Sequence, residues 1–149
     1  MSDPTDDAPA ELTTLDEGTL LDYITGQPVK DTPKEQVRQR IGRALFHEYA
    51  ISVEDMQPDF RLKVDGKTKK VDIAIFTRGS AHTVDNLRRI VVCEKEPTNG
   101  KKGAYRLRDH EQAKKEFELL HGAMAAAEPC KYGLWTNGLE FFFFKKEVT

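Results

Sequence analysis

Two short apolar stretches that each contain acidic residues constrain this chain most strongly. The first is Val71 to Phe76, which contains Asp72, and the second is Ile90 to Glu96, which contains Glu94 and ends in a second glutamate. Short runs rich in β-branched residues are typical of buried strands. A carboxylate buried in such a strand costs several kcal/mol unless a basic side chain or a metal ion pairs with it. The pattern therefore predicts two neighbouring strands whose acidic residues surround a cation.

Side chains alternate along a strand, so Glu94 and Glu96 would share one face, and Asp72 would join them where the strands pair. Oxygen ligands of this kind suit Mg²⁺, which takes one or two carboxylates together with a phosphate oxygen. The simpler interpretation is that each acid is solvated at a strand end or pairs with a basic neighbour such as Lys95. Three carboxylates on adjacent strands favour the cation site.

Length and composition limit the class of protein. A chain of 149 residues with 38% hydrophobic and 32% charged residues is typical of one globular domain. Neither a membrane-spanning apolar run nor a signal peptide is recognisable, so we expect a cytoplasmic protein without membrane contact. Cys93 and Cys130 lack the spacing of zinc or redox motifs, and we expect both to be small buried hydrophobic residues.

Charge is distributed unevenly along the chain. Residues 1–22 hold seven acidic residues and no Lys or Arg, which leaves 25 − 7 = 18 acidic against 23 basic residues in the remainder. We interpret residues 1–16 as a disordered acidic tail and 17–149 as a single domain. Residues 61–115 hold 15 basic and seven acidic residues. This excess favours a polyanion such as DNA, although a solvated lysine-rich surface explains it equally well. The candidates for contact with a DNA backbone are Lys69, Lys70, Lys101, Lys102 and Arg106.

Local signals predict the first elements. A capping box at Thr32 to Glu35, with proline at the first helical position, predicts a helix from Pro33 to Tyr49. A short helix is expected before it, over Leu15 to Ile24. Asp65-Gly66 is a strong hairpin signal that joins a strand at Phe60 to Val64 to the strand of Asp72.

The second half of the chain supplies a helix and two more strands. An N-terminal cap predicts a helix from Asp109 to about Ala127, and strands follow at Lys131 to Thr136 and Leu139 to Glu147. Asn137-Gly138 predicts a two-residue hairpin turn between them. Because Phe141 to Phe144 is apolar on both faces, we expect a central or helix-covered strand there. The order α-β-β-β-α-β-β predicts an α/β (α+β) fold, a mixed sheet flanked by helices.

This order, with an acid on the middle strand of the meander, resembles the PD-(D/E)xK nuclease superfamily and its restriction-endonuclease-like fold. More narrowly, it resembles the N-terminal nuclease domain of type I restriction enzyme R subunits. The resemblance rests on Tyr23-Ile24-Thr25-Gly26, Val29-Lys30-Asp31-Thr32-Pro33, Glu35 with Val37-Arg38-Gln39, Val71-Asp72-Ile73-Ala74-Ile75-Phe76, Gln112, and Tyr132-Gly133-Leu134-Trp135-Thr136-Asn137-Gly138. It implies a DNA endonuclease that uses Mg²⁺, or Mn²⁺ in its place, within a restriction-type complex of further domains or subunits. The chain would then be the N-terminal piece of a longer protein.

The resemblance also implies site residues, with Asp72 as a metal-binding aspartate. The family usually continues with Val-Glu-x-Lys, whereas this chain has Val92-Cys93-Glu94-Lys95-Glu96. Alignment on Pro97 keeps Lys95 as the lysine but puts Cys93 where the glutamate belongs. Alignment on Glu94 keeps the glutamate and puts Glu96 in the place of the lysine.

Strand alternation favours the second alignment, with Asp72 and Glu94 as metal ligands and Glu96 as the group that accepts a proton from water. Lys95 would reach the site through a bulge. Helix residues that assist the family site map to Glu35 and Gln112, for which helix capping is an equally good explanation.

Two other functions are compatible with the sequence. One is the same fold with a decayed motif, kept as a module that binds DNA or a partner. The other is an interaction domain unrelated to nucleic acid, whose acids pair with nearby basic residues. Three carboxylates without a metal would repel one another, which favours the nuclease.

Overall fold

The computed structural model of the chain describes residues 17–97 and 111–147. The elements are β1 (Thr19–Leu21), β2 (Pro28–Lys30), α1 (Pro33–Tyr49), β3 (Met56–Val64), β4 (Lys67–Phe76), β5 (Leu87–Cys93), α2 (Glu111–Ala126), β6 (Tyr132–Thr136) and β7 (Phe141–Lys145), with short 3-10 turns at Val53–Asp55 and Val84–Asn86. The predicted acidic tail and the candidates Lys101, Lys102 and Arg106 lie outside the described residues.

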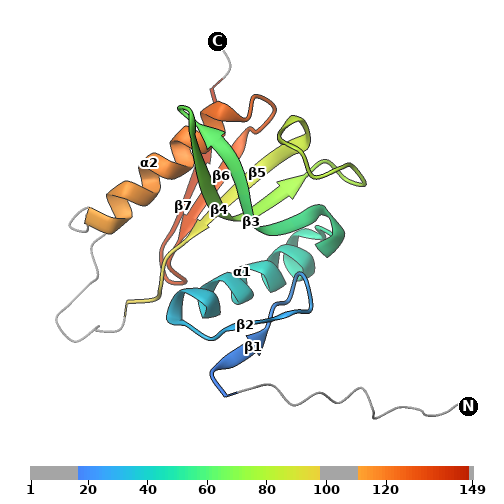
Figure 1. Cartoon of the computed structure of the whole chain (residues 1–149), viewed down its shortest axis with the longest axis vertical. Coiled ribbons are helices and arrows are strands. Elements are labelled where there is room, and N and C mark those ends of the chain that lie inside the picture. The colour runs from blue at the N-terminus through green and yellow to red at the C-terminus, as the bar shows by residue number, and fades with distance from the viewer. Residues whose placement is uncertain (1–16, 98–110, 148–149) are drawn as a thin grey trace, which may run out of the picture.

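Five strands form one mixed sheet in the order β3-β4-β5-β6-β7 (Figure 1). Neighbouring strands are antiparallel except β5 and β6, which are parallel and joined through α2. The tight turn at Asp65-Gly66 has positive φ at both residues, as the hairpin signal predicted. The predicted mixed sheet flanked by helices is therefore confirmed.

The segment before α1 differs from the prediction. Thr19–Leu21 forms strand β1 and pairs with β2, so the helix expected over Leu15 to Ile24 is wrong. Gly18 and Gly26 both adopt positive φ, and the Asp22 carboxylate accepts a hydrogen bond from the Ile24 amide at 3.0 Å. Glycine turns and an aspartate that accepts a hydrogen bond from the amide two residues on compete with a helix, and in this segment they replace it.

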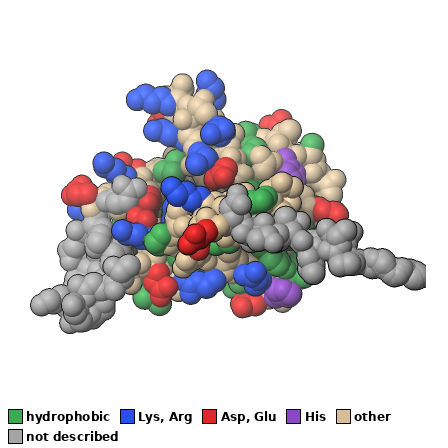
Figure 2. All heavy atoms as spheres, turned by 60° about the horizontal axis from the view of Figure 1, so that its bottom comes forward, with side chains coloured by type: hydrophobic (Ala, Val, Ile, Leu, Met, Phe, Trp, Pro, Cys, Tyr) green, Lys and Arg blue, Asp and Glu red, His purple; other side chains and the backbone are tan. Residues whose placement is uncertain are grey.

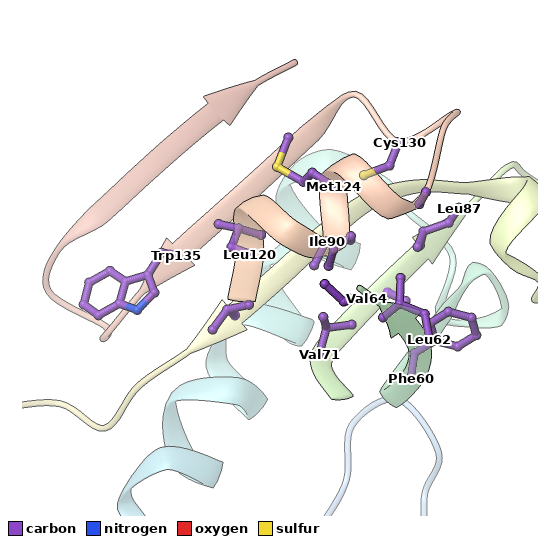
Figure 3. Close-up of a cluster of buried hydrophobic side chains, with 14 of the residues drawn as sticks. Phe60, Leu62, Val64, Val71, Leu87, Ile90, Leu120, Met124, Cys130 and Trp135 are labelled. Carbon is purple, nitrogen blue, oxygen red and sulfur yellow. The ribbon is translucent and has the colours of Figure 1, made fainter. Parts of the chain in front are cut away.

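The two helices cover opposite faces of the sheet. Leu120 and Met124 of α2 belong to one buried cluster, and Val37 and Ile41 of α1 belong to another. Figure 3 shows the first cluster, in which α2 side chains lie over Ile90 and the Trp135 ring closes one end. The middle strands are therefore buried on both faces. Neither helix in the described residues is long and apolar enough to cross a bilayer.

Helix α1 has the predicted bounds. The Thr32 hydroxyl accepts a hydrogen bond from the Glu35 amide at 3.0 Å, Pro33 occupies the first turn, and Ala50 ends the helix in the left-handed conformation. Thr32 is therefore the N-cap of α1, as the capping box in the sequence predicted.

Strand β7 contradicts the expectation of a covered strand. It lies at the edge of the sheet, and Phe141, Phe142 and Phe143 are exposed. Thr136 pairs with Phe141, so the connection is four residues long and not two. An apolar run indicates a hydrophobic strand but does not show whether the strand is central or at the edge. The edge position of β7 follows from the crossover that places β6 beside β5.

Strand β5 ends at Cys93, three residues earlier than predicted. Glu94 and Glu96 therefore follow the strand, and strand alternation does not determine where they point. The last residue pair between β4 and β5 is Ile73 with Val91. Both cysteines are buried and free, as predicted.

Candidate functional site

A buried carboxylate lies where two neighbouring strands separate. Residues of β4 before Ile73 pair only with β3, so β4 and β5 form a fork at Asp72. Asp72 is 6% exposed, and its Oδ2 accepts a hydrogen bond from the Cys93 amide at 2.7 Å. Its Oδ1 is 3.0 Å from Nζ of Lys34, which lies in the first turn of α1. The Asp72 side chain thus joins β4 to the end of β5 and to α1.

The electrostatics of the fork reflect this burial. Burial raises the pKa of Asp72, and the nearby Asp59 raises it further, while Lys34 and the Cys93 amide lower it; the net shift is upward. Burial lowers the pKa of Lys34, but attraction to Asp72 and then to Glu116 outweighs it, so this pKa is raised. The Lys34 side chain remains 46% exposed, which leaves its ammonium group free to exchange Asp72 for water.

A second charged network lies beside the fork at the start of α1. The buried Arg38 guanidinium pairs with Glu35 at 2.5 Å and with Asp22 at 3.4 Å. Gln39 donates to the Glu35 carboxylate at 2.9 Å. Glu35, a predicted auxiliary residue, therefore uses its carboxylate within this network, while its amide takes part in the Thr32 cap.

Cys93 lies next to Asp72 and is fully buried. Burial, followed by the charge of Asp72, raises the pKa of the Cys93 thiol well above its usual range. The thiol is therefore protonated at neutral pH. A neutral sulfur atom is a poor ligand for Mg²⁺, which prefers oxygen.

The other predicted residues lie around the fork without converging on Asp72. Glu94 accepts a hydrogen bond from the Lys95 amide at 2.8 Å, and Glu96 is 3.3 Å from Arg40. Lys95 is exposed. Across residues 17–97 and 111–147, no three His, Cys, Asp or Glu side chains are placed to hold a metal ion. The catalytic roles of Glu94, Lys95 and Glu96 stay predictions, as does that of Gln112, which lies in the first turn of α2.

Sequence reasoning missed two residues that the structure brings to this region, Lys34 and Glu116. Glu116 of α2 is buried, and its Oε1 accepts a hydrogen bond from Nε1 of Trp135 at 2.9 Å. The signal was available, because Glu116 falls on the apolar stripe that includes Ala113 and Leu120. A charged residue on a buried stripe is a candidate for a functional role. Lys34, by contrast, has no such signal in the sequence, because its contact with Asp72 depends on how α1 packs against the sheet.

A basic hairpin leads to the fork. The exposed basic residues of β3 and β4 are Arg61, Lys63, Lys67, Lys69 and Lys70. Figure 2 shows Lys and Arg side chains gathered on a projection of the surface, and acidic side chains among basic ones on the same face. Lys69 is three residues before Asp72 on β4, or about 10 Å at the rise of a strand. The hairpin therefore carries exposed positive charge along the strand that leads to Asp72.

The two helices and the five-stranded mixed sheet form an α/β fold that is broadly consistent with a nuclease-like one. Residues 33–149 match the family model described as type I restriction enzyme R protein N terminus (HSDR_N), and the chain belongs to this family. The match begins at the first residue of α1 and includes the fork and the whole main sheet. Searches of curated proteins and of solved structures gave no match.

Proposed function

We propose that this chain is a Mg²⁺-dependent DNA endonuclease domain of the PD-(D/E)xK type, acting in a type I restriction-like system. The observation that carries the proposal is Asp72, a buried carboxylate fixed at a strand fork at the end of a basic hairpin. Family membership supports a role within a larger restriction complex. DNA would be bound through its phosphates by Lys69 and Lys70, and by the basic residues of the 101–106 segment.

The chemistry of Asp72 fits a hard divalent cation. Mg²⁺ needs only one or two protein carboxylates, since waters and a substrate phosphate complete its shell. One Asp72 oxygen is fixed by the Cys93 amide, and the other contacts Lys34, whose side chain is 46% exposed and can turn towards water. When bound, the ion would supply Lewis-acid stabilisation of the phosphodiester and a water of lowered pKa.

Residues of this chain would then position the reactants. Lys34, once released from Asp72, carries its positive charge at the edge of the same site and can pair with a phosphate oxygen. In the sequence-based assignment, Glu94 is a ligand and Glu96 accepts the proton from the attacking water. For Glu94 to reach Asp72, its carboxylate must leave the Lys95 amide. Lys95 is exposed beside the fork and would contact the DNA.

A second candidate function is a DNA- or partner-binding module with a decayed nuclease site. The specific observation in its favour is that Cys93 stands beside Asp72, where alignment on Pro97 would put the glutamate. Lys34 also pairs with Asp72 and balances its charge. The basic hairpin would still bind a phosphate backbone in such a module.

Cleavage of supercoiled plasmid by the purified chain, in Mg²⁺ or Mn²⁺, separates the two functions. Wild type should nick or linearise the plasmid, Asp72→Asn should abolish this, and Asp85→Asn, the same change at an exposed loop position, should leave it intact. Cleavage that persists in Asp72→Asn would refute the proposed site. A wild type that does not cut, but shifts DNA in a salt-dependent manner that Lys69→Gln weakens, would support the binding module.

A further inference from the structure

We infer that the edge strand β7 pairs with β7 of a second copy of this chain, so that two five-stranded sheets join into one continuous sheet about a twofold axis. The inference is independent of the proposed function. It is carried by the backbone groups that β7 leaves at the edge of the sheet, by its exposed phenylalanine side chains and by the order of charges at its two ends.

The outer side of β7 presents backbone hydrogen-bonding groups. It is the last strand of the sheet, and no strand within residues 17–97 and 111–147 pairs with that side (Figure 1). The Lys146 amide donates to the Lys131 carbonyl at 2.8 Å, so the backbone groups of Lys146 point at β6. Backbone groups alternate between the two sides of a strand in an antiparallel pair. The residues of β7 whose N–H and C=O groups point away from β6 are therefore Phe141, Phe143 and Lys145.

The side chains of β7 leave apolar area uncovered on one face. Phe142 and Phe144 contact the Phe117 ring of α2, with centroid distances of 5.6 and 5.5 Å. Phe141 and Phe143 stack on each other at 6.5 Å between centroids, and they are 48% and 69% exposed. These two rings border a groove of about 540 Å³ between α1 and the sheet. A hydrophobic edge strand of this kind is a site for pairing with another strand.

The opposite edge of the sheet shows what protection against pairing looks like. Strand β3 contains Pro58, which has no N–H, and Asp59, whose φ of 55° interrupts the ladder. It also carries the exposed side chains of Arg61 and Lys63. Proline, bulges and charges are the features that prevent edge-to-edge association. Residues 141–144 of β7 have none of them, so only one of the two edges is suited to a partner strand.

The order of charges selects a second copy as that partner. Antiparallel pairing of β7 with itself, centred on Phe143, puts Glu140 opposite Lys146 of the partner subunit, because each lies three residues from the centre. The same register puts Lys145 opposite Phe141 of the partner subunit, away from its own copy. A parallel arrangement would instead place like charges side by side. The strand is therefore self-complementary in the antiparallel direction.

Sedimentation equilibrium of the purified chain tests the inference. We expect a reversible monomer–dimer equilibrium with a Kd of about 1–100 µM, because a five-residue strand and its apolar rows form a small interface. A chain that stays monomeric up to about 500 µM overturns the inference and leaves β7 for an extended peptide of another protein. Open-ended assembly also overturns it, since twofold pairing through one edge stops at the dimer.

Phe143→Lys tests the centre of the interface. It puts like charges opposite each other at the twofold axis and should raise the Kd of the dimer about tenfold or more. Leu21→Lys is the matched control, because Leu21 is 54% exposed and lies in the separate two-stranded sheet. It should leave the Kd within a factor of about two. Equal effects of the two variants would show non-specific apolar contact and would count against strand pairing.

Lys145→Pro tests the backbone without removing an apolar side chain. Proline removes an N–H that points away from β6, so the sheet within the subunit keeps its hydrogen bonds while the dimer loses two. The Kd should rise about tenfold relative to Lys145→Ala, which keeps the N–H. Equal Kd values for proline and alanine would contradict pairing through the backbone.

Glu140→Gln tests the charge order. Glutamine can still accept the hydrogen bond that the Asn137 amide group donates to Glu140 at 2.9 Å, so the change removes charge alone. The Kd should rise about threefold, whereas Glu147→Gln, which is outside the predicted charge pair, should leave it nearly unchanged. The reverse result would contradict the register centred on Phe143.

Circular dichroism of each variant checks that the fold is retained. If Lys145→Pro does not fold, hydrogen exchange of the Phe143 and Lys145 amides in wild type takes its place. Both amides point to the outer edge, so their protection should increase with protein concentration. Exchange that is independent of concentration would overturn the inference.

Discussion

Two buried aspartates, each paired with a base from α1, play different parts in this molecule. Asp22 contacts Arg38, and both side chains are 3% exposed; Asp22 also accepts from the Ile24 amide. Asp72 is also buried, with its side chain 8% exposed, but it pairs with Lys34, whose side chain is 46% exposed. The first pair is closed inside the protein, whereas the base of the second can move into water. Whether the base can leave distinguishes an architectural ion pair from one available to a ligand.

The energetic consequence follows from desolvation. Removing one partner of a fully buried pair leaves a charge without compensation and costs about 3–5 kcal/mol. Removing a half-exposed base such as Lys34 costs less, because water already solvates part of that ion pair, although the carboxylate that remains is buried. The Asp22–Arg38 and Asp72–Lys34 pairs both join a buried aspartate to a base of α1, but we expect them to respond differently to mutation.

The largest effect is expected for Arg38→Ala. It leaves Asp22 and Glu35 without their guanidinium partner and should lower the free energy of unfolding by about 3–5 kcal/mol in urea titrations. Arg40→Ala is the matched control, since Arg40 lies two residues on and pairs with the half-exposed Glu96. It should cost less than about 1 kcal/mol. Equal losses in the two variants would contradict the distinction between closed and open pairs.

A pH-dependent effect is expected for Asp72. Its pKa in the folded protein is raised above the ordinary value of 3.8, so in that range the folded state holds the proton more tightly than the unfolded state. Stability contributed by protonated Asp72 is present below about pH 3.8 and is lost as the pH rises through the folded pKa. Compared with Asp72→Asn, wild type should therefore lose stability over this window.

Urea unfolding at several pH values, from about 3.5 upward, measures this difference. Asp85→Asn, at an exposed position, should show no corresponding change with pH. A wild type that gains stability relative to Asp72→Asn as the pH rises would mean that the pairing with Lys34 dominates burial.

The smallest effect on stability is expected for Lys34→Gln. Because only one partner of this pair is buried, loss of Lys34 should lower the free energy of unfolding by about 1–2 kcal/mol, less than in Arg38→Ala. The same variant should bind Mn²⁺ several-fold more tightly, since the ion no longer competes with Lys34 for Asp72. Calorimetric titration of wild type and variant measures the ratio. Weaker binding in Lys34→Gln would show that Lys34 supports the cation and does not compete with it.

Much of the fold could be predicted because its signals are local. The Thr32 cap marked the start of α1, and the Asp65-Gly66 turn marked the β3–β4 hairpin. The burial of Asp72 followed from its apolar neighbours. These features depend on contacts within a few residues, which periodicity and turn chemistry capture.

The remaining features depend on tertiary structure. The end of β5 at Cys93 coincides with the last residue pair between β5 and β6, and the exposure of Phe143 reflects the edge position of β7 in the sheet. Neither property is encoded in a short pattern. Glu116 is an intermediate case, because its place on the apolar stripe of α2 was visible but its partner Trp135 lies on another element.

The crossover through α2 also bears on the order in which the molecule assembles. Between β4 and β5, Phe76 pairs with Leu87, a separation of 87 − 76 = 11 residues, whereas β5 and β6 pair Arg89 with Tyr132, 132 − 89 = 43 residues apart. Pairs close in sequence form faster than distant ones. During folding, and during synthesis from the N-terminus, we expect Asp72 to acquire its Cys93 anchor first and Glu116 to arrive later with β6. The β4–β5 pairing beside Asp72 and the β5–β6 pairing beside Glu116 are thus separate events in time.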